Sequence, residues 1–204
     1  RKDVFLSCKT AKRDRKAADA ELKESLRRLR TDHIDLYQLH HIFTLEGDIE
    51  PAFAKGGVME TLIEARKAGV VRYLGFSAHT VEAAVAAMER FEFDSAMFPV
   101  NFASIRKGGF GPQIISAARK KGVTCIALKG MARQPWPKDD PRRKDHPICW
   151  YQPITDRREA QLSLRYTLSQ PIVAAIPPAD ASLLPLAFDI AAGFRPITPG
   201  ELAE

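Results

Sequence analysis

The sequence predicts an α/β protein of the (β/α)8 barrel type, forming a single domain over residues 1–204 that contains about six of the eight βα units. Two observations indicate this class: helical and strand-like patterns alternate along the whole chain, and one helix-to-strand junction occurs twice. A third observation favours the barrel over an open dinucleotide-binding sheet, because no glycine-rich turn follows the first strand.

The first helix and the two strands beside it show these patterns most clearly. Between Asp14 and Arg30, apolar residues recur at three- and four-residue steps and form one stripe on a charged helix. The runs at 4–10 and 34–40 are short and strand-like. The later elements follow the same alternation, with helices near 57–68, 80–91, 112–121, 156–169 and 180–192, and strands near 70–77, 95–101, 123–129 and 172–176.

The repeated junction consists of a basic helix end, a glycine and a valine that enters a strand. It occurs at 66–70 and again at 119–123, with Gly69 and Gly122 as the helix stops. Basic side chains suit the negative end of a helix, and glycine tolerates the positive φ of a left-handed stop. Two βα units separate the copies, so the pattern indicates a modular parallel sheet rather than an antiparallel α+β arrangement.

Glycine placement gives little support for a phosphate-binding loop. Residues 9–12, at the end of the first strand, contain no glycine. The glycine cluster at 108–111 opens a helix near residue 112, and a simple chain turn is the stronger interpretation of it.

The segment at 131–155 has no helix or strand periodicity and is rich in proline. Loops of this length in compact domains are usually lids or disordered tethers. Because disordered tethers contain few aromatic residues, Trp136, Trp150 and Tyr151 favour a lid, which we call the lid segment.

Composition and charge indicate a soluble protein. The chain carries a net charge of +6, with 45% hydrophobic and 27% charged residues. No base-stacking aromatics accompany the basic residues, so we expect solvated helix faces rather than a nucleic-acid site. A basic rim near a phosphate-bearing cofactor remains a third interpretation.

Cysteine usage and hydropathy add expectations about the chain's environment. Cys8, Cys125 and Cys149 are an odd number without short paired spacing, so we expect no disulfide framework and no metal site. No run approaches the roughly 20 apolar residues that a bilayer span requires. We therefore expect a cytoplasmic protein without a membrane partner.

Lys9 and His40 are the candidate catalytic residues, because each lies at the carboxyl end of a predicted strand. In parallel α/β barrels this is the end where chemistry takes place. A lysine there favours the deprotonated form of a neighbouring acid, and a histidine can exchange protons near neutral pH. A surface lysine and a structural histidine are the alternative interpretations, and spacing leaves open whether His40 or His41 faces the barrel axis.

Several motifs in order resemble one family. Residues 26–40 (LRRLRTDHIDLYQLH) resemble the aldo-keto reductases, whose fourth barrel strand ends in the catalytic His, and residues 5–10 (FLSCKT) look like their third strand, which ends in the catalytic Lys. Residues 69–77 (GVVRYLGFS) look like the fifth strand with its Ser at the nicotinamide. Residues 98–101 and 176–178 fall where the sixth and eighth strands should end.

The resemblance implies an oxidoreductase that reduces a small-molecule carbonyl to an alcohol with hydride from NAD(P)H. Lys9 and His40 would take two of the four catalytic positions, and Ser77 and Lys129 would contact the cofactor. NADP is the expected cofactor, with NAD as the alternative, since 178–184 contains no Lys or Arg to hold a 2'-phosphate. Ala78, Met97 and Leu128 depart from the residues that the family often has around nicotinamide.

The resemblance also places the start of this chain at the family's third strand, so the catalytic Asp and Tyr are not among its residues. We therefore expect the isolated chain to show little or no carbonyl reduction, and we expect its exposed barrel edges to favour self-association. The alternative interpretation is a catalytically inactive nucleotide-binding or regulatory barrel.

Overall fold

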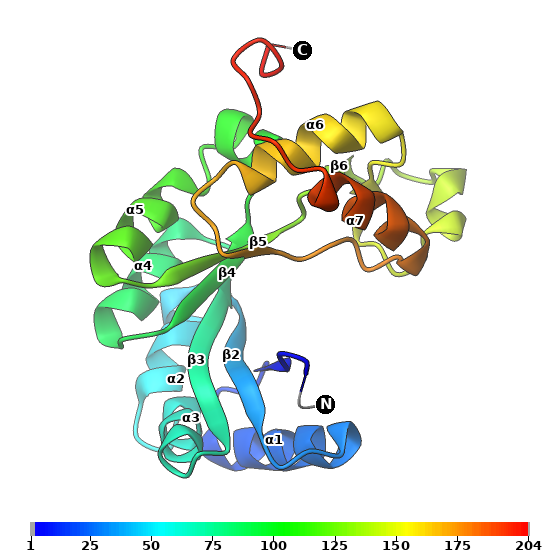
Figure 1. The fold of residues 1–204 in the computed structure, drawn as a ribbon. Helices are drawn as coiled ribbons and strands as arrows, with labels where there is room; N and C mark the ends of the chain where they lie inside the picture. The colour runs from blue at the N-terminus through cyan, green and yellow to red at the C-terminus, as the bar shows by residue number, and fades with distance from the viewer. Residues whose placement is uncertain (1–2, 204) are drawn as a thin grey trace. The chain divides into compact units, whose positions relative to one another are not determined.

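A computed structural model describes residues 3–203, which divide into two compact units. Unit 1 comprises residues 3–98 and 113–124, and unit 2 comprises 99–112 and 125–203. The units are described separately, and Figure 1 shows the elements of each along the chain. No helix within 3–203 combines the length and the apolar character needed to cross a bilayer.

Unit 1 is a parallel sheet with helices in the connections between its strands. Its strands lie in the order β1-β2-β3-β4, with parallel pairing throughout. The elements are β1 (Ser7–Thr10), α1 (Arg15–Leu29), β2 (Ile34–Ile42), α2 (Glu50–Phe53), α3 (Val58–Lys67), β3 (Val71–Ala78), α4 (Val81–Arg90), β4 (Ser95–Pro99) and α5 (Pro112–Lys121). The parallel βαβ pattern predicted from the alternation is therefore confirmed.

Local signals explain the helix boundaries in unit 1. The Asp14 carboxylate caps α1 by accepting the Ala17 N–H at 2.9 Å, and Arg30 adopts a left-handed conformation at the other end. Gly69 and Gly122 have φ of 73° and 70°, as the repeated junction predicted. Basic ends and glycine stops therefore set these helix-to-strand transitions.

Unit 2 combines a parallel strand pair, a small antiparallel pair and two helices. β5 (Thr124–Leu128) pairs in parallel with β8 (Ala174–Ala175), and β6 (Ala132–Pro135) pairs in antiparallel fashion with β7 (Tyr151–Pro153). The helices are α6 (Arg157–Leu168) and α7 (Leu184–Ala192). Their apolar faces meet in a core formed by Met131, Ile154, Ala160, Leu164, Ala187 and Ile190.

Some boundaries differ from the sequence-based expectations. The lid segment is not purely a loop, since it contains the β6–β7 pair. The sequence did not predict these strands, because alternation over three or four residues is too short to detect. The strand expected at 4–10 is confined to Ser7–Thr10, and the strand expected at 172–176 to two residues. The helix expected from residue 180 begins as a 3-10 turn capped by Asp180, and α7 starts at Leu184.

Candidate active site

Three of the four residues that the sequence singled out lie at the carboxyl ends of neighbouring strands in unit 1. Lys9, near the end of β1, pairs in register with Gln38 of β2. Neighbours in register point to the same face of a sheet, and side chains alternate along a strand, so His40 shares this face with Lys9. Ser77 is the last residue but one of β3 and is 3% exposed.

A polar row continues across the sheet at the level of Lys9. Gln38 pairs with Gly75, and Gly75 pairs with Ser95. The Gln38 amide is fully buried, and neither its oxygen nor its nitrogen has a hydrogen-bond partner among the described residues. A Cβ at Gly75 would lie 2.3 Å from the Ser95 hydroxyl oxygen, so this strand position requires glycine. The sheet face that carries Lys9 therefore has a buried amide, that of Gln38, whose donor and acceptor are both unsatisfied.

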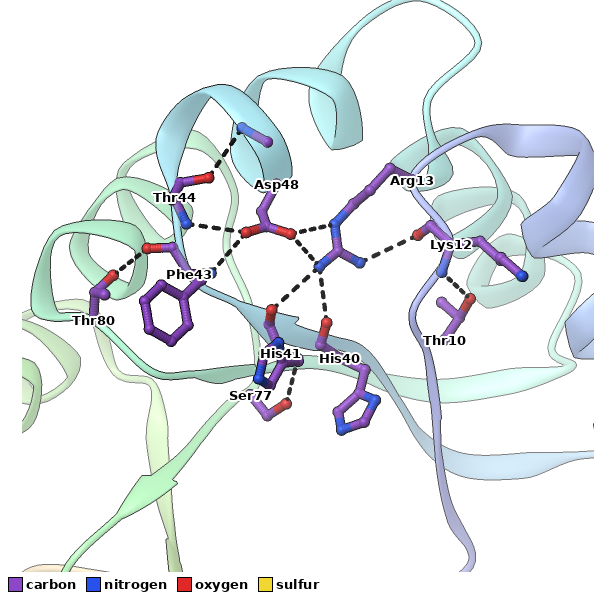
Figure 2. Close-up of polar contacts among 11 residues, drawn as sticks. Thr10, Lys12, Arg13, His40, His41, Phe43, Thr44, Asp48, Ser77 and Thr80 are labelled. Atoms are coloured by element: carbon purple, nitrogen blue, oxygen red, sulfur yellow. Dashed lines mark hydrogen bonds and ion pairs between the residues drawn. The ribbon is translucent and has the colours of Figure 1, made fainter.

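An ion pair fixes the backbone at the end of β2, as Figure 2 shows. The Arg13 guanidinium donates to the His40 carbonyl at 2.8 Å and to the Asp48 carboxylate at 2.6 Å. The other Asp48 oxygen accepts the backbone N–H groups of Phe43 and Thr44 at 2.8 and 3.0 Å. Because Arg13 precedes α1 and Asp48 follows β2, this contact ties the segments after two strands together.

The backbone geometry distinguishes the two adjacent histidines. His41 has a φ of 60°, and the register between β2 and β3 shifts between Leu39 and Ile42. The centre of the His41 ring lies 4.2 Å from that of the His79 ring, and the His41 backbone N–H donates to the Ser77 hydroxyl oxygen at 2.8 Å. His41 is therefore held against the end of β3. His40 is the histidine that shares the sheet face of Lys9.

Charge and burial keep His40 neutral. Partial burial, followed by the positive charge of Lys9, lowers the pKa of His40 below its ordinary value. Burial also lowers the pKa of Lys9, and no carboxylate among the described residues opposes this effect. At neutral pH His40 is thus a neutral imidazole, with one N–H to donate, beside a lysine ammonium.

Unit 1 contains two tyrosines, Tyr37 and Tyr73. Tyr37 is buried, and the groups that influence its pKa are Glu21, Thr10, Cys8 and Ser25. Burial is the largest of these influences, and it raises the pKa of Tyr37. Tyr73 is 41% exposed and stacks on Phe5. Unit 1 therefore provides the cation and the imidazole, and neither tyrosine stands out as a proton donor beside them.

Lys129, the fourth predicted residue, lies in unit 2 directly after β5. Its φ is 62°, and its carbonyl accepts the Asn101 side-chain amide at 3.1 Å. Its ammonium lies 5.9 Å from the centre of the Tyr151 ring, and burial lowers its pKa. Burial raises the pKa of Tyr151 to about 12, so this ring stays neutral. Lys129 is thus a half-buried cation without a carboxylate partner within 3–203.

Sequence reasoning did not identify Arg13 or Asp48, which lie 35 residues apart. In the sequence, each of them looks like one of many surface charges, and they come together only when the chain folds at the end of β2. No group of three or more His, Cys, Asp or Glu side chains within residues 3–203 could hold a metal ion.

We expect Asp48→Asn to lower the free energy of unfolding by about 2 kcal/mol at pH 7, because the charged hydrogen bonds of Asp48 to Arg13 and to two backbone N–H groups are weakened. Burial raises the pKa of Asp48, but the Thr44 and Phe43 N–H groups and Arg13 outweigh it and hold this pKa below its usual range. The stabilisation is therefore complete above about pH 4 and is lost as pH falls through the folded-state pKa.

Urea unfolding at pH 7 and pH 3 measures this effect. The difference between the wild type and Asp48→Asn should shrink at pH 3. Glu46→Gln, on the same turn and exposed to solvent, is the matched control and should leave the stability unchanged. Equal stability of Asp48→Asn and the control at pH 7 would show that the Arg13–Asp48 contact does not hold the end of β2.

Comparison with known proteins points to one family. The family model described as "Aldo/keto reductase family" matches residues 1–147. Protein tas of Escherichia coli (strain K12) is 38% identical over 77 residues, which make up 33% of this chain and 22% of that protein. The match thus spans about a fifth of the length of this curated relative.

Solved structures share the fold. An aldo-keto reductase of Bacillus halodurans in its holo form has a TM-score of 0.68 and 21% identity, with 100% of this chain and 72% of that chain covered. A Bombyx mori aldo-keto reductase in complex with NADP has a TM-score of 0.65 and 18% identity, with coverage of 100% and 67%. These likenesses confirm the α/β fold of (β/α)8 barrel type.

Proposed function

Because the chain belongs to the aldo/keto reductase family, we propose that it reduces a small-molecule carbonyl compound to an alcohol, with NADP(H) as the preferred cofactor. The observation that carries this proposal is that Lys9 and a neutral His40 lie on one face at the ends of neighbouring parallel strands. A carbonyl oxygen that gains negative charge needs such donors, and strand ends hold them in place.

The roles of the two residues follow from their charge states. The neutral His40 imidazole donates an N–H hydrogen bond to the carbonyl oxygen and so orients the substrate. The Lys9 ammonium stabilises negative charge on that oxygen and lowers the pKa of an acid that donates the proton. A bound nicotinamide cofactor would supply the hydride, and the Arg13–Asp48 ion pair keeps the His40 backbone in position.

The residues proposed for cofactor binding suit a nicotinamide dinucleotide. Ser77 uses its hydroxyl oxygen as an acceptor and keeps its proton, which can be donated to a carboxamide. The Lys129 ammonium lies beside the Tyr151 ring and has no carboxylate partner within 3–203. Its charge is therefore available to pair with a phosphate of the cofactor. Residues 178–184 contain one charged residue, Asp180, and no Lys or Arg that could hold a 2'-phosphate. NADH binding should therefore be measured in parallel with NADPH binding.

We expect NADPH to quench the fluorescence of Trp136 and Trp150 saturably, because both lie in the lid segment. Lys129→Met should weaken NADPH binding roughly tenfold through loss of a phosphate contact. Lys138→Met removes an exposed charge from the lid segment and is the matched control. Absence of quenching in a chain that circular dichroism shows to be folded would contradict cofactor binding.

A second function, nucleotide binding without catalysis, is favoured because Lys9 is not among the groups that influence the pKa of Tyr37, and because Tyr73 is 41% exposed and stacks on Phe5. It predicts saturable NADPH binding without oxidation in the presence of any carbonyl compound. Turnover that depends on Lys9 and His40 would reject it.

A further inference from the structure

Unit 2 contains a cavity of about 310 Å³ that none of Lys9, His40, Ser77 or Lys129 lines. Its walls come from α6, β6, the turn at 103–107 and the C-terminal segment at 197–202, and we call it the α6 cavity. Within unit 2, the C-terminal segment (red) can be followed from α7 in Figure 1. This volume is near the lower limit of small-molecule sites and about twice the roughly 150 Å³ that holds a benzene ring.

One side of the α6 cavity is apolar and well anchored. Phe102, Ile154, Leu162 and Ile197 line it. The Phe102 ring packs edge-to-face against Tyr166, with the ring centres 5.4 Å apart. The backbone beneath is also fixed, since the Ile154 N–H donates to the Met131 carbonyl at 2.9 Å. These contacts form a preorganised apolar wall that suits a planar ring.

The acidic groups of the α6 cavity are neutralised. Glu159 receives two hydrogen bonds from Arg133, and both residues line the cavity. Glu201 is paired with the Arg165 guanidinium at 2.6 Å. The carboxylates at this site therefore do not repel an anion strongly.

Two groups on the cavity wall remain available to a ligand. Lys107 forms no ion pair or hydrogen bond with any residue in 3–203, and the Tyr166 hydroxyl likewise has no hydrogen-bond partner there. Burial raises the pKa of Tyr166, and the charge of Arg106 opposes this, which places a second cation near the hydroxyl. A buried neutral phenol and an exposed, unpaired lysine thus line the same cavity.

We propose that the α6 cavity binds a small aromatic monocarboxylate. The ring packs on Phe102 and the aliphatic wall, and the carboxylate accepts hydrogen bonds from Lys107 and the Tyr166 hydroxyl. Lys107 is the cation among the lining residues that has no ion-pair partner within 3–203, and it fits one carboxylate, while the volume fits one ring with a short substituent. This site is independent of the carbonyl reduction proposed above.

Isothermal calorimetry with benzoate tests the proposal, and benzamide is the neutral probe of the same shape. We expect saturable benzoate binding by the full chain and at least tenfold weaker binding of benzamide. Lys107→Met and Tyr166→Phe should each weaken benzoate binding, the first by roughly tenfold and the second by roughly threefold. Lys138→Met and His40→Ala should leave it unchanged.

Each other outcome overturns the assignment. Equal binding of benzamide, or unchanged benzoate binding by Lys107→Met, would show that the charge does not recognise the ligand. Loss of binding in His40→Ala with retention in Lys107→Met would place the anion at the candidate catalytic site instead. Absence of benzoate binding at millimolar concentration by the folded chain would reject the site while leaving the proposed NADPH binding untouched.

Discussion

Replacing Lys9 with Met is expected to lower the kcat of any carbonyl reduction that the chain performs by roughly 10²- to 10³-fold, as loss of one group that stabilises an oxyanion does in other enzymes. It is also expected to raise the pKa of His40, because the Lys9 charge disfavours the imidazolium. The first effect is measured by NADPH oxidation with an aldehyde substrate. The second is measured by NMR titration of the His40 ring.

The titration makes this test independent of turnover. If the chain binds NADPH without reducing any carbonyl compound, the shift in the pKa of His40 still reports whether Lys9 lies beside it. Lys12→Met is the matched control, since Lys12 is exposed and is not among the groups that influence the pKa of His40. An unchanged pKa of His40 in Lys9→Met would contradict the arrangement from which the proposed catalysis follows.

The order of helices and strands was accessible from the sequence because local physics sets it. The apolar stripe of α1, the Asp14 cap and the left-handed stops at Gly69 and Gly122 all act within one or two turns. The placement of Lys9 near one of two adjacent histidines was accessible for a related reason, since parallel strands bring their carboxyl ends to one edge of a sheet. Alternation of strands and helices therefore predicted their proximity.

The features that fix the candidate site were not accessible from the sequence. The Arg13–Asp48 contact joins residues 35 positions apart, and neither flanking sequence differs from an ordinary solvated segment. The left-handed conformation of His41 breaks the alternation by which strand faces are assigned, so the pattern alone could not separate it from His40. Contacts of this kind depend on tertiary packing, which periodicity does not encode.

The C-terminal segment carries the second large expected effect. Arg165 of α6 is 1% exposed, and its guanidinium donates to both Glu201 oxygens at 2.6 and 2.9 Å. It also donates to the carbonyls of Arg195 and Pro196, each at 2.8 Å. A single buried guanidinium therefore holds the segment that follows α7 and that lines the α6 cavity.

Glu201→Gln is expected to lower Tm by roughly 10 °C, because it leaves the buried Arg165 charge without a carboxylate partner. The Arg165 hydrogen bonds, followed by those of Thr198, lower the pKa of Glu201 to about 2. The stabilisation is thus complete above about pH 4.3 and is lost as pH falls toward 2. Differential scanning calorimetry of both proteins between pH 2 and pH 7 measures the effect.

A surface ion pair between α6 and α7 provides the control for this prediction. Arg157 pairs with Asp189 at 3.1 Å, with both side chains mostly exposed, so Arg157→Gln should change Tm very little. Because Glu201 also lines the α6 cavity, Glu201→Gln should weaken benzoate binding as the C-terminal segment loosens, whereas Arg157→Gln should not. Equal Tm values for the two variants would show that Arg165 does not depend on Glu201 for its burial.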